Sequence, residues 1–203
     1  MLDKNNTLSN LGALKCVELE LGCGGKKLKN DSIGIDLIDY DCVDIVGDIF
    51  KVLAAFPDET VDKIVAHHFI EHIDNLSDLI TEFNRVVKNG GTIEILVPHF
   101  SNPFFYSDPT HRNFFGLYTF QYYFNSESIF KRKVPNYNSK LKMEVISVDL
   151  FFKSYKPNYL RHGFKKLFQL FFNFNTTTKE MYEELFCYII PCYEVKYIIL
   201  NRR

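Results

Sequence analysis

The chain has 203 residues, of which 46% are hydrophobic and 24% are charged, and its formal net charge is −1. This composition excludes a disordered chain, because nearly half of the residues can be buried in a core. The sequence contains no run of about 18 apolar residues, so it predicts no membrane-spanning segment. The first ten residues also lack the apolar stretch that is typical of a signal peptide.

Aromatic rings and charges are unevenly distributed along the chain. Residues 1–99 contain five of the Phe and Tyr residues, and residues 100–203 contain 27. Residues 1–99 carry 17 Asp and Glu against 9 Lys and Arg, a net charge of −8, whereas residues 100–203 carry 8 against 15, a net charge of +7. The basic half either faces an anionic partner or neutralises the acidic half within one fold.

The cysteines favour a reducing, cytoplasmic setting. Their number is odd, no two have CxxC spacing, and no His/Cys group has the spacing of a zinc site. We therefore expect no metal site. The five cysteines are Cys16, Cys23, Cys42, Cys187 and Cys192.

The first half of the chain predicts strands that alternate with helical stretches. Short apolar segments predict strands over residues 15–21, 32–37, 43–46, 61–66 and 92–97. Residues 75–88 carry apolar side chains at helical spacing, which predicts a helix. Strand–helix–strand units with apolar strands indicate a mostly parallel sheet. We find no linker, so we expect one domain over residues 1–203.

The second half has a different pattern. Residues 100–135 are aromatic and irregular, and we expect a long insertion after the fifth strand. Residues 142–152 and 193–201 predict strands, and residues 164–174 and 179–189 predict helices between them. Two late strands joined by helices indicate an antiparallel C-terminal edge on the parallel sheet.

The residues that follow the predicted strands are the candidate ligand-binding residues, because ligands of open α/β sheets bind at the carboxyl ends of the strands. The turn at residues 22–25 (Gly-Cys-Gly-Gly) allows close approach of the main chain to a ligand. Asp36 ends the second strand, where a carboxylate can accept both hydroxyls of a ribose. The spacing from Gly22 to Asp36 is shorter than the ~20 residues of a dinucleotide fingerprint. This spacing argues against the alternative of a nucleotide-binding oxidoreductase.

Five segments in order resemble motifs of class I S-adenosylmethionine-dependent methyltransferases. Residues 17–25 (VELELGCGG) resemble the first motif, Asp36 matches the ribose-binding acid, and residues 48–49 match the acidic-apolar pair beside the adenine. Residues 61–73 (VDKIVAHHFIEHI) and 85–91 (RVVKNGG) match two further motifs. The sequence departs from the pattern at Lys26, where a third glycine is usual, and in a link too short for a full first helix.

This resemblance implies a Rossmann-like methyltransferase fold, an enzyme, and S-adenosyl-L-methionine as cofactor. It implies cofactor contacts by ten residues at the strand ends. These are Glu20, Gly22, Cys23, Gly24, Asp36, Leu37, Asp48, Ile49, His67 and His68.

Residues 98–115 (PHFSNPFFYSDPTHRNFF) are similar to a narrower subgroup of predicted methyltransferases often associated with surface polysaccharide biosynthesis. The resemblance implies O-methylation of a carbohydrate, nucleotide-activated or phosphate-type precursor. The alternative outside enzymology is a cofactor-binding partner subunit without turnover. Residues 131–133 are too short a basic run to predict nucleic-acid binding.

The same segment supplies the candidate catalytic and acceptor-binding residues. If the acceptor is a hydroxyl, a base must take its proton. We expect His111 to act as that base, with Asp108 orienting it, and His99 as a further candidate. Arg112 is a candidate for pairing with an acceptor phosphate. Phe105 and Tyr106 are candidates for acceptor contacts.

Three further features have two readings each. Residues 114–130 form either a lid over the acceptor or a packed part of the core. Residues 161–174 are basic and apolar, and we expect a core helix in preference to a helix on an anionic membrane surface. Residues 68–72 fit the H-x-x-E-H pattern of inverted zinc peptidases, but they follow a strand, so we do not expect a peptidase.

Overall fold

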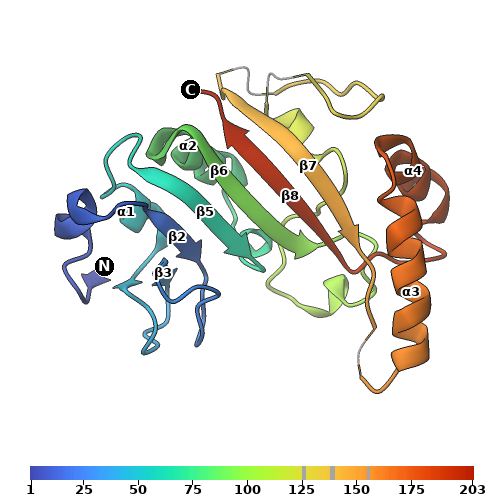
Figure 1. The fold of residues 1–203 in the computed structure, drawn as a ribbon, viewed down its shortest axis with the longest axis horizontal. Coiled ribbons are helices and arrows are strands. Elements are labelled where there is room, and N and C mark those ends of the chain that lie inside the picture. The colour runs from blue at the N-terminus through green and yellow to red at the C-terminus, as the bar shows by residue number, and fades with distance from the viewer. Residues whose placement is uncertain (125–126, 138–139, 155) are drawn as a thin grey trace.

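The computed structural model describes residues 1–124, 127–137, 140–154 and 156–203. One eight-stranded sheet crosses the molecule in the order β1-β4-β3-β2-β5-β6-β8-β7 (Figure 1). The strands are β1 (Leu2–Asp3), β2 (Glu18–Leu21), β3 (Ile33–Asp36), β4 (Ile45–Val46), β5 (Val61–His67), β6 (Val87–Pro98), β7 (Met143–Phe151) and β8 (Glu194–Asn201).

Helices connect the later strands. The α-helices are α1 (Ile49–Leu53), α2 (Leu76–Val86), α3 (Tyr159–Phe172) and α4 (Thr176–Met181). The short helical turns are η1 (Leu8–Ala13), η2 (Ile70–His72), η3 (Phe105–Ser107), η4 (Thr119–Tyr122) and the π-helical η5 (Tyr182–Phe186).

The predicted fold class is confirmed. Strands β4, β3, β2, β5 and β6 are parallel, and β8 and β7 add an antiparallel edge next to β6. The sheet is mostly parallel because β5, α2 and β6 form a strand–helix–strand unit of apolar strands. The parallel strands therefore all end at the same edge of the sheet.

Element boundaries differ from the predictions where tertiary pairing competes with helical periodicity. The 75–88 helix ends at Val86, since Val87 pairs with Val61 and begins β6. Helix α3 begins at Tyr159, five residues before the predicted start. The 179–189 helix begins at Thr176, where Asn175 accepts a hydrogen bond from the Thr178 amide in a capping box.

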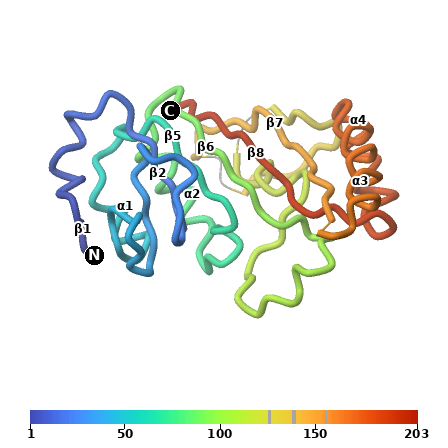
Figure 2. The backbone as a smooth tube through the Cα atoms, turned by 60° about the horizontal axis from the view of Figure 1, so that its bottom comes forward, coloured from blue at the N-terminus to red at the C-terminus, as the bar shows by residue number. Residues whose placement is uncertain are grey.

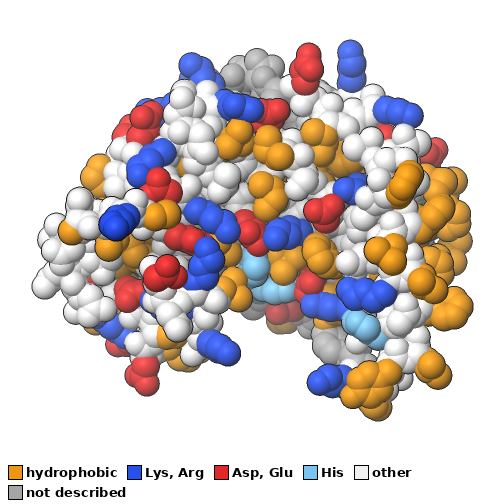
Figure 3. Space-filling view, viewed as in Figure 1, with side chains coloured by type: hydrophobic (Ala, Val, Ile, Leu, Met, Phe, Trp, Pro, Cys, Tyr) orange, Lys and Arg blue, Asp and Glu red, His pale blue; other side chains and the backbone are white. Residues whose placement is uncertain are grey.

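Helices cover the sheet unevenly. In Figure 1, α1 and α2 lie behind the sheet, and α3 and α4 stand beside β7. Residues 22–32 and 37–44 form no helix, as the short first link predicts. Over β5, β6 and β8 the front face consequently lacks a helix within the described residues, and it carries charged and apolar side chains in its centre (Figure 3).

Helix α3 differs from the core helix expected for residues 161–174. Only Phe172 of the helix is buried, and Phe168 packs partly against the core. Leu160 is 92% exposed, and Leu170 is 73% exposed. The helix thus contacts the sheet through one edge and leaves most of its large apolar side chains in solvent (Figure 3). Among the described residues no helix has the length and apolar character to cross a membrane.

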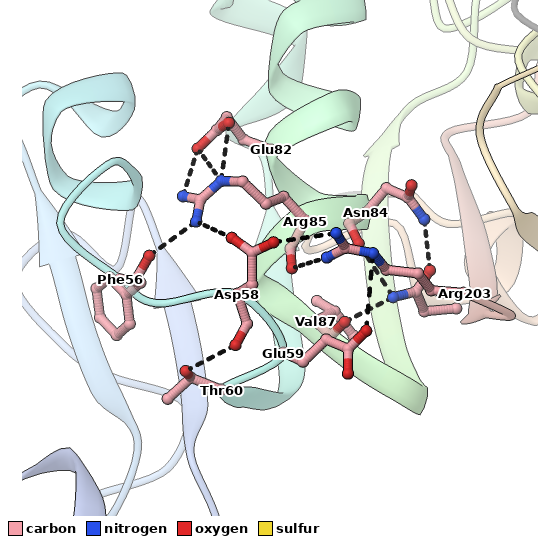
Figure 4. Close-up of polar contacts among 10 residues, drawn as sticks. Phe56, Asp58, Glu59, Thr60, Glu82, Asn84, Arg85, Val87 and Arg203 are labelled. Atoms are coloured by element: carbon pink, nitrogen blue, oxygen red, sulfur yellow. Dashed lines mark hydrogen bonds and ion pairs between the residues drawn. The ribbon is translucent and has the colours of Figure 1, made fainter.

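Arg85, in the last turn of α2, joins that helix to the loop after α1 (Figure 4). Its guanidinium donates to the main-chain oxygens of Leu53 (2.8 Å) and Phe56 (2.9 Å). It also pairs with Glu82 at 2.7 Å and Asp58 at 3.0 Å. The arginine of the 85–91 motif is therefore a clamp between α2 and the preceding loop.

Replacing Arg85 by methionine is expected to lower the free energy of unfolding by about 2–3 kcal/mol, because two main-chain carbonyls lose a charged donor. Urea denaturation measures the loss. Arg202→Met is the matched control, since Arg202 pairs with Glu144 at the surface, and its loss is expected below about 0.5 kcal/mol. Equal losses of unfolding free energy in the two variants would contradict a stabilising role of the Arg85 contacts.

A row of charges crosses the uncovered face of the sheet. Glu94 of β6 binds Lys63 of β5 at 3.0 Å, Lys196 of β8 at 2.7 Å and the Nε2 atom of His67 at 3.2 Å. Burial raises the pKa of Glu94, but hydrogen bonds and charge from Lys196 and Lys63 outweigh burial and lower its pKa to about 2. The folded state therefore favours the ionised carboxylate.

The Glu94→Gln variant should be less stable than the wild type at pH 7 by about 2 kcal/mol, since Gln removes the charge and keeps the shape. The depressed pKa contributes stability above about pH 4.5, and this contribution is lost as the pH falls toward 2. Denaturation from pH 7 to pH 2 should show the gap closing in that window. The stabilising role of the Glu94 charge would be refuted if the difference in free energy of unfolding between the wild type and Glu94→Gln stayed constant with pH. It would also be refuted if the exposed Glu184→Gln showed the same difference.

Candidate active site

The turn after β2 brings main chain to the carboxyl edge of the sheet. Gly22 has φ +63° and Gly24 has φ +58°, both left-handed conformations that favour glycine. A Cβ at Gly22 would lie 2.6 Å from the ring of Phe69, whereas one at Gly24 would meet nothing within 4 Å. Packing therefore requires Gly22, and open space beside Gly24 lets a ligand reach the main chain.

Asp36 lies beside this turn at the end of β3. Its Oδ2 atom accepts a hydrogen bond from the Gly24 amide at 2.8 Å, and its Oδ1 atom accepts one from the Ile38 amide at 2.9 Å. Leu37, the next residue, is 73% exposed. The two predicted cofactor elements, the glycine turn and the acid, are thus brought together by direct contact.

Two of the expected cofactor residues serve the loop itself. Glu20 is buried, accepts from the Leu28 amide at 2.8 Å and from the Ser32 hydroxyl at 3.1 Å, and so holds the loop before β3. Cys23 is also buried, and burial raises the pKa of its thiol to about 12, so it is a neutral packing group. Both side chains support the loop, and the cofactor contacts expected of these two residues stay a prediction.

The pair at residues 48–49 begins α1. The Oδ1 atom of Asp48 accepts a hydrogen bond from the Lys51 amide at 3.2 Å and caps the helix. Ile49 is buried in the core, and its expected contact with the cofactor stays a prediction. Asp48 remains exposed after the fourth strand of the sheet.

The two histidines at the end of β5 have different partners. His67 belongs to the row around Glu94. His68 has φ +52°, and its ring lies between Glu194 (3.1 Å) and Glu71 (3.4 Å). Hydrogen bonds to Glu194 and then Glu71 raise the pKa of His68 to about 9, so it is a cation at neutral pH.

The segment after β6 folds back onto the turn after β5 (Figure 2). The Arg112 amide donates to the Glu71 main-chain oxygen at 2.7 Å, and the Asn113 side chain donates to the Ile73 oxygen at 2.6 Å. These contacts bring His111 next to His72, with ring centroids 5.0 Å apart. The resulting cluster around His72 and His111 lies at the edge where the parallel strands end.

Within this cluster Asp108 does not orient His111 as predicted. Asp108 Oδ2 lies 3.8 Å from the Nε2 atom of His111, which is too long for a hydrogen bond. The carbonyl oxygen of Phe105, 2.9 Å from Nδ1, orients the His111 ring instead. Asp108 accepts the Thr110 hydroxyl at 2.6 Å, and that hydroxyl contacts His72 at 2.8 Å. The aspartate therefore orients His72.

His99 lies inside the core. Its side chain is fully buried, its Nδ1 atom contacts the Ser101 hydroxyl at 2.8 Å, and its Nε2 atom contacts Glu183 at 3.2 Å. Both ring nitrogens are thus used inside the core. The structure contradicts the expectation that His99 is catalytic.

The three candidate acceptor residues lie around His111 with different exposure. Tyr106 is 72% exposed, whereas Phe105 is buried against the His111 ring at 4.6 Å. The side chain of Arg112 is exposed and lies 3.4 Å from Asp74. Tyr106 and Arg112 are accessible to an acceptor, and the Phe105 ring packs against the His111 ring.

Residues 19–95, which include the glycine turn, Asp36 and both histidines after β5, match a family model described as a methyltransferase domain. The match covers this part of the chain, which holds the glycine turn and the strands that follow it. The chain is an enzyme that uses S-adenosylmethionine. This match does not favour the two alternative predictions, a nucleotide-binding oxidoreductase and a cofactor-binding partner subunit without turnover.

Solved structures show the same fold over nearly the whole methyltransferase. A SAM-dependent methyltransferase from Archaeoglobus fulgidus is 18% identical, with 96% of this chain and 93% of that chain covered and a TM-score of 0.57. A putative methyltransferase from Bacillus halodurans is 15% identical, with 97% of both chains covered and a TM-score of 0.52. A search of curated proteins found no match.

The methyltransferase has an aromatic cavity of about 590 Å³. Its wall includes Phe114, Tyr118, Tyr122, Tyr123 and Tyr137. The phenylalanines of the same segment, Phe115, Phe120, Phe124 and Phe130, are buried in the core. Residues 114–130 therefore include rings that pack in the core and rings that line the cavity, and Phe115 does both, whereas Phe114 and the tyrosines belong to the cavity wall.

The sequence predictions missed two residues of the cluster. Glu71 and His72 stand in the 61–73 segment that resembles a methyltransferase motif and also in the peptidase pattern, but neither is among the predicted site residues, and here they lie on the short turn η2. The usable signal was their position directly after β5. His111 lies some 40 residues further along the chain, so no local spacing joins it to them.

Proposed function

We propose that the methyltransferase transfers a methyl group to an oxygen of a carbohydrate, nucleotide-activated or phosphate-type precursor of a surface glycan. The observation that carries the proposal is the aromatic cavity, whose wall includes Phe114, three residues after His111 in the chain. Aromatic rings stack on the apolar faces of sugars and bases, and tyrosine hydroxyls form hydrogen bonds to their polar edges. The glycan assignment rests on the resemblance of residues 98–115.

The residues at the ends of β2 and β3 fit the cofactor. The main chain at Gly24 is open to a ligand, and the Asp36 carboxylate, which is partly buried, faces the same turn. In the proposed complex Asp36 accepts the ribose hydroxyls, and the 22–25 turn supports the remaining cofactor atoms. When bound, S-adenosylmethionine supplies an electrophilic methyl group, whose bond to sulfur breaks with both electrons left on sulfur.

In this proposal the residues that follow β5 and β6 bind the acceptor and remove its proton. A hydroxyl acceptor loses its proton as its oxygen bonds to the methyl carbon, and a phosphate-type oxygen is already ionised. His111 Nδ1 donates to a carbonyl oxygen, so its Nε2 atom carries a lone pair and is the proposed proton acceptor. We propose that residues 1–99 hold the cofactor and residues 100–203 hold the acceptor.

Charge around the cavity is mixed, because Glu183 lies in its wall and two cations of the same half of the chain are candidates for contact with an anionic acceptor. The guanidinium carbon of Arg132 lies 5.3 Å from the centre of the Tyr118 ring, which lines the cavity. Arg112 is exposed next to His111. Both cations come from the half of the chain with a net charge of +7.

Calorimetry with S-adenosylhomocysteine, followed by transfer of labelled methyl groups to a panel of glycan precursors, tests the proposal. We expect binding of the nucleoside and labelling of a precursor that contains a sugar or phosphate. Binding without labelling of any precursor, together with labelling of proteins or nucleic acids, would overturn the acceptor class. Absence of binding would overturn the cofactor site.

A further inference from the structure

Three side chains at the carboxyl edge have the composition of a metal site. Glu71, His72 and His111 each offer one ligand atom, and these atoms lie within 4.8 Å of one another. Glu71 and His72 come from the turn η2 after β5, and His111 comes from the segment after β6. Two imidazoles and one carboxylate are a recurrent ligand set for divalent transition metals.

The hydrogen bonds around His111 leave the correct nitrogen for a metal. The carbonyl oxygen of Phe105 can only accept, so His111 carries its proton on Nδ1, 2.9 Å away. Its Nε2 atom then has a free lone pair. Metal-binding histidines commonly donate their other N–H to a main-chain carbonyl in this way.

The same argument applies to His72. The Thr110 hydroxyl has one proton, and it donates that proton to Asp108 Oδ1 at 2.6 Å. The hydroxyl must therefore accept from His72 Nδ1, 2.8 Å away, and this fixes the lone pair of His72 on Nε2. Two histidines from different segments thus each present Nε2.

Glu71 provides the second, independent observation. Its side chain is 1% exposed, and its Oε1 atom lies 3.4 Å from His68. Its Oε2 atom is buried and has no hydrogen-bond partner among the described residues. A buried carboxylate oxygen without a partner costs free energy, and a cation compensates that cost.

Main-chain contacts hold the three side chains in place without a metal. Arg112 and Asn113, which follow His111, bind the main-chain oxygens of residues 70, 71 and 73 at distances from 2.6 to 3.3 Å. These bonds fix the segment after β6 against the turn after β5. The ligand set is consequently built before any cation arrives, which lowers the cost of binding.

We propose that Glu71, His72 and His111 bind a divalent transition-metal cation at the end of β5. Three protein ligands leave coordination positions for an acceptor oxygen, and a bound cation lowers the pKa of a hydroxyl that it contacts. In the metal-bound site Nε2 of His111 is a ligand, which replaces its role as the base, and the proton of the hydroxyl leaves to solvent. This catalytic use rests on the proposed function, but cation binding does not.

Titration of chelator-treated protein with Co²⁺, followed by absorption spectroscopy and calorimetry, tests the site. We expect one equivalent to bind to the wild type and the Kd to rise at least 100-fold in His72→Ala, whose side chain is exposed. Glu71→Gln should weaken binding similarly. The matched control is His162→Ala on α3, which should bind Co²⁺ as the wild type does.

Thr110 is a positioning residue in this proposal. Thr110→Val should raise the Kd for Co²⁺ by about 10–100-fold, and Thr110→Ser should restore it, because serine keeps the hydroxyl between Asp108 and His72. A merely structural role for Thr110 would leave the Kd unchanged in both variants.

The failures of the two proposals are distinguishable. No bound equivalent of Co²⁺, or equal binding by the wild type and His72→Ala, would overturn the metal site even if S-adenosylhomocysteine binds. Co²⁺ binding that His72→Ala abolishes, with methyl transfer unaffected by chelation, would overturn only its catalytic use.

Discussion

The Asp36→Asn variant is expected to lose at least 100-fold in affinity for S-adenosylhomocysteine. A carboxylate can accept two hydroxyl hydrogen bonds, each contributing about 1.5–3 kcal/mol when the acceptor is charged. Asparagine keeps the size but replaces one acceptor oxygen with a donor. Since Asp36 also accepts the Gly24 amide, the glycine turn loses a charged anchor in the same step. Calorimetry measures the change in Kd.

The control for this experiment is Asp41→Asn in the exposed turn after β3, which should leave the Kd within about twofold. Thermal unfolding of both variants without ligand separates a loss of binding from a loss of fold. An Asp36→Asn protein that folds and binds with the wild-type Kd would remove Asp36 from the cofactor site.

The Gly22→Ala variant is expected to be destabilised by about 3 kcal/mol or more. An alanine with φ +63° costs about 1–2 kcal/mol. Its Cβ would also lie 2.6 Å from the Phe69 ring, so the turn or the ring must move. Urea denaturation without ligand gives the free energy of unfolding.

Gly24→Ala is the matched comparison. It has nearly the same φ but open space around the new Cβ, so only the conformational cost of about 1–2 kcal/mol is expected. Adding Phe69→Leu to Gly22→Ala should recover part of the extra loss, and the double-mutant cycle measures that coupling. Equal destabilisation by the two alanines would show that the clash is relieved without cost.

The cofactor side of the site is the part that the sequence predicts best. The 22–25 turn and Asp36 are separated by one short loop and lie at the ends of neighbouring parallel strands, so local pattern and sheet topology suffice to bring them together. The side chains are less predictable than their positions. Glu20 and Ile49 stand at matching motif positions, yet one binds the loop and the other packs in the core.

The acceptor side depends on contacts between distant segments. His72 and His111 are joined through Thr110 and through main-chain bonds of Asn113 to the turn after β5. Nothing in the spacing of these residues indicates that pairing. His99 shows the opposite error, because a histidine that directly follows a strand proved to be fully buried behind Ser101 and Glu183.

Strand periodicity and chain order are local properties, so the amino-acid sequence predicts the parallel sheet and its antiparallel edge without the structure. The sequence also determined the division into an acidic, ring-poor half and a basic, ring-rich half. Only the tertiary structure decided which rings pack and which line the cavity, and which histidines share an edge. Burial and hydrogen bonding depend on neighbours from other segments, and those neighbours are set by the packing of the whole chain.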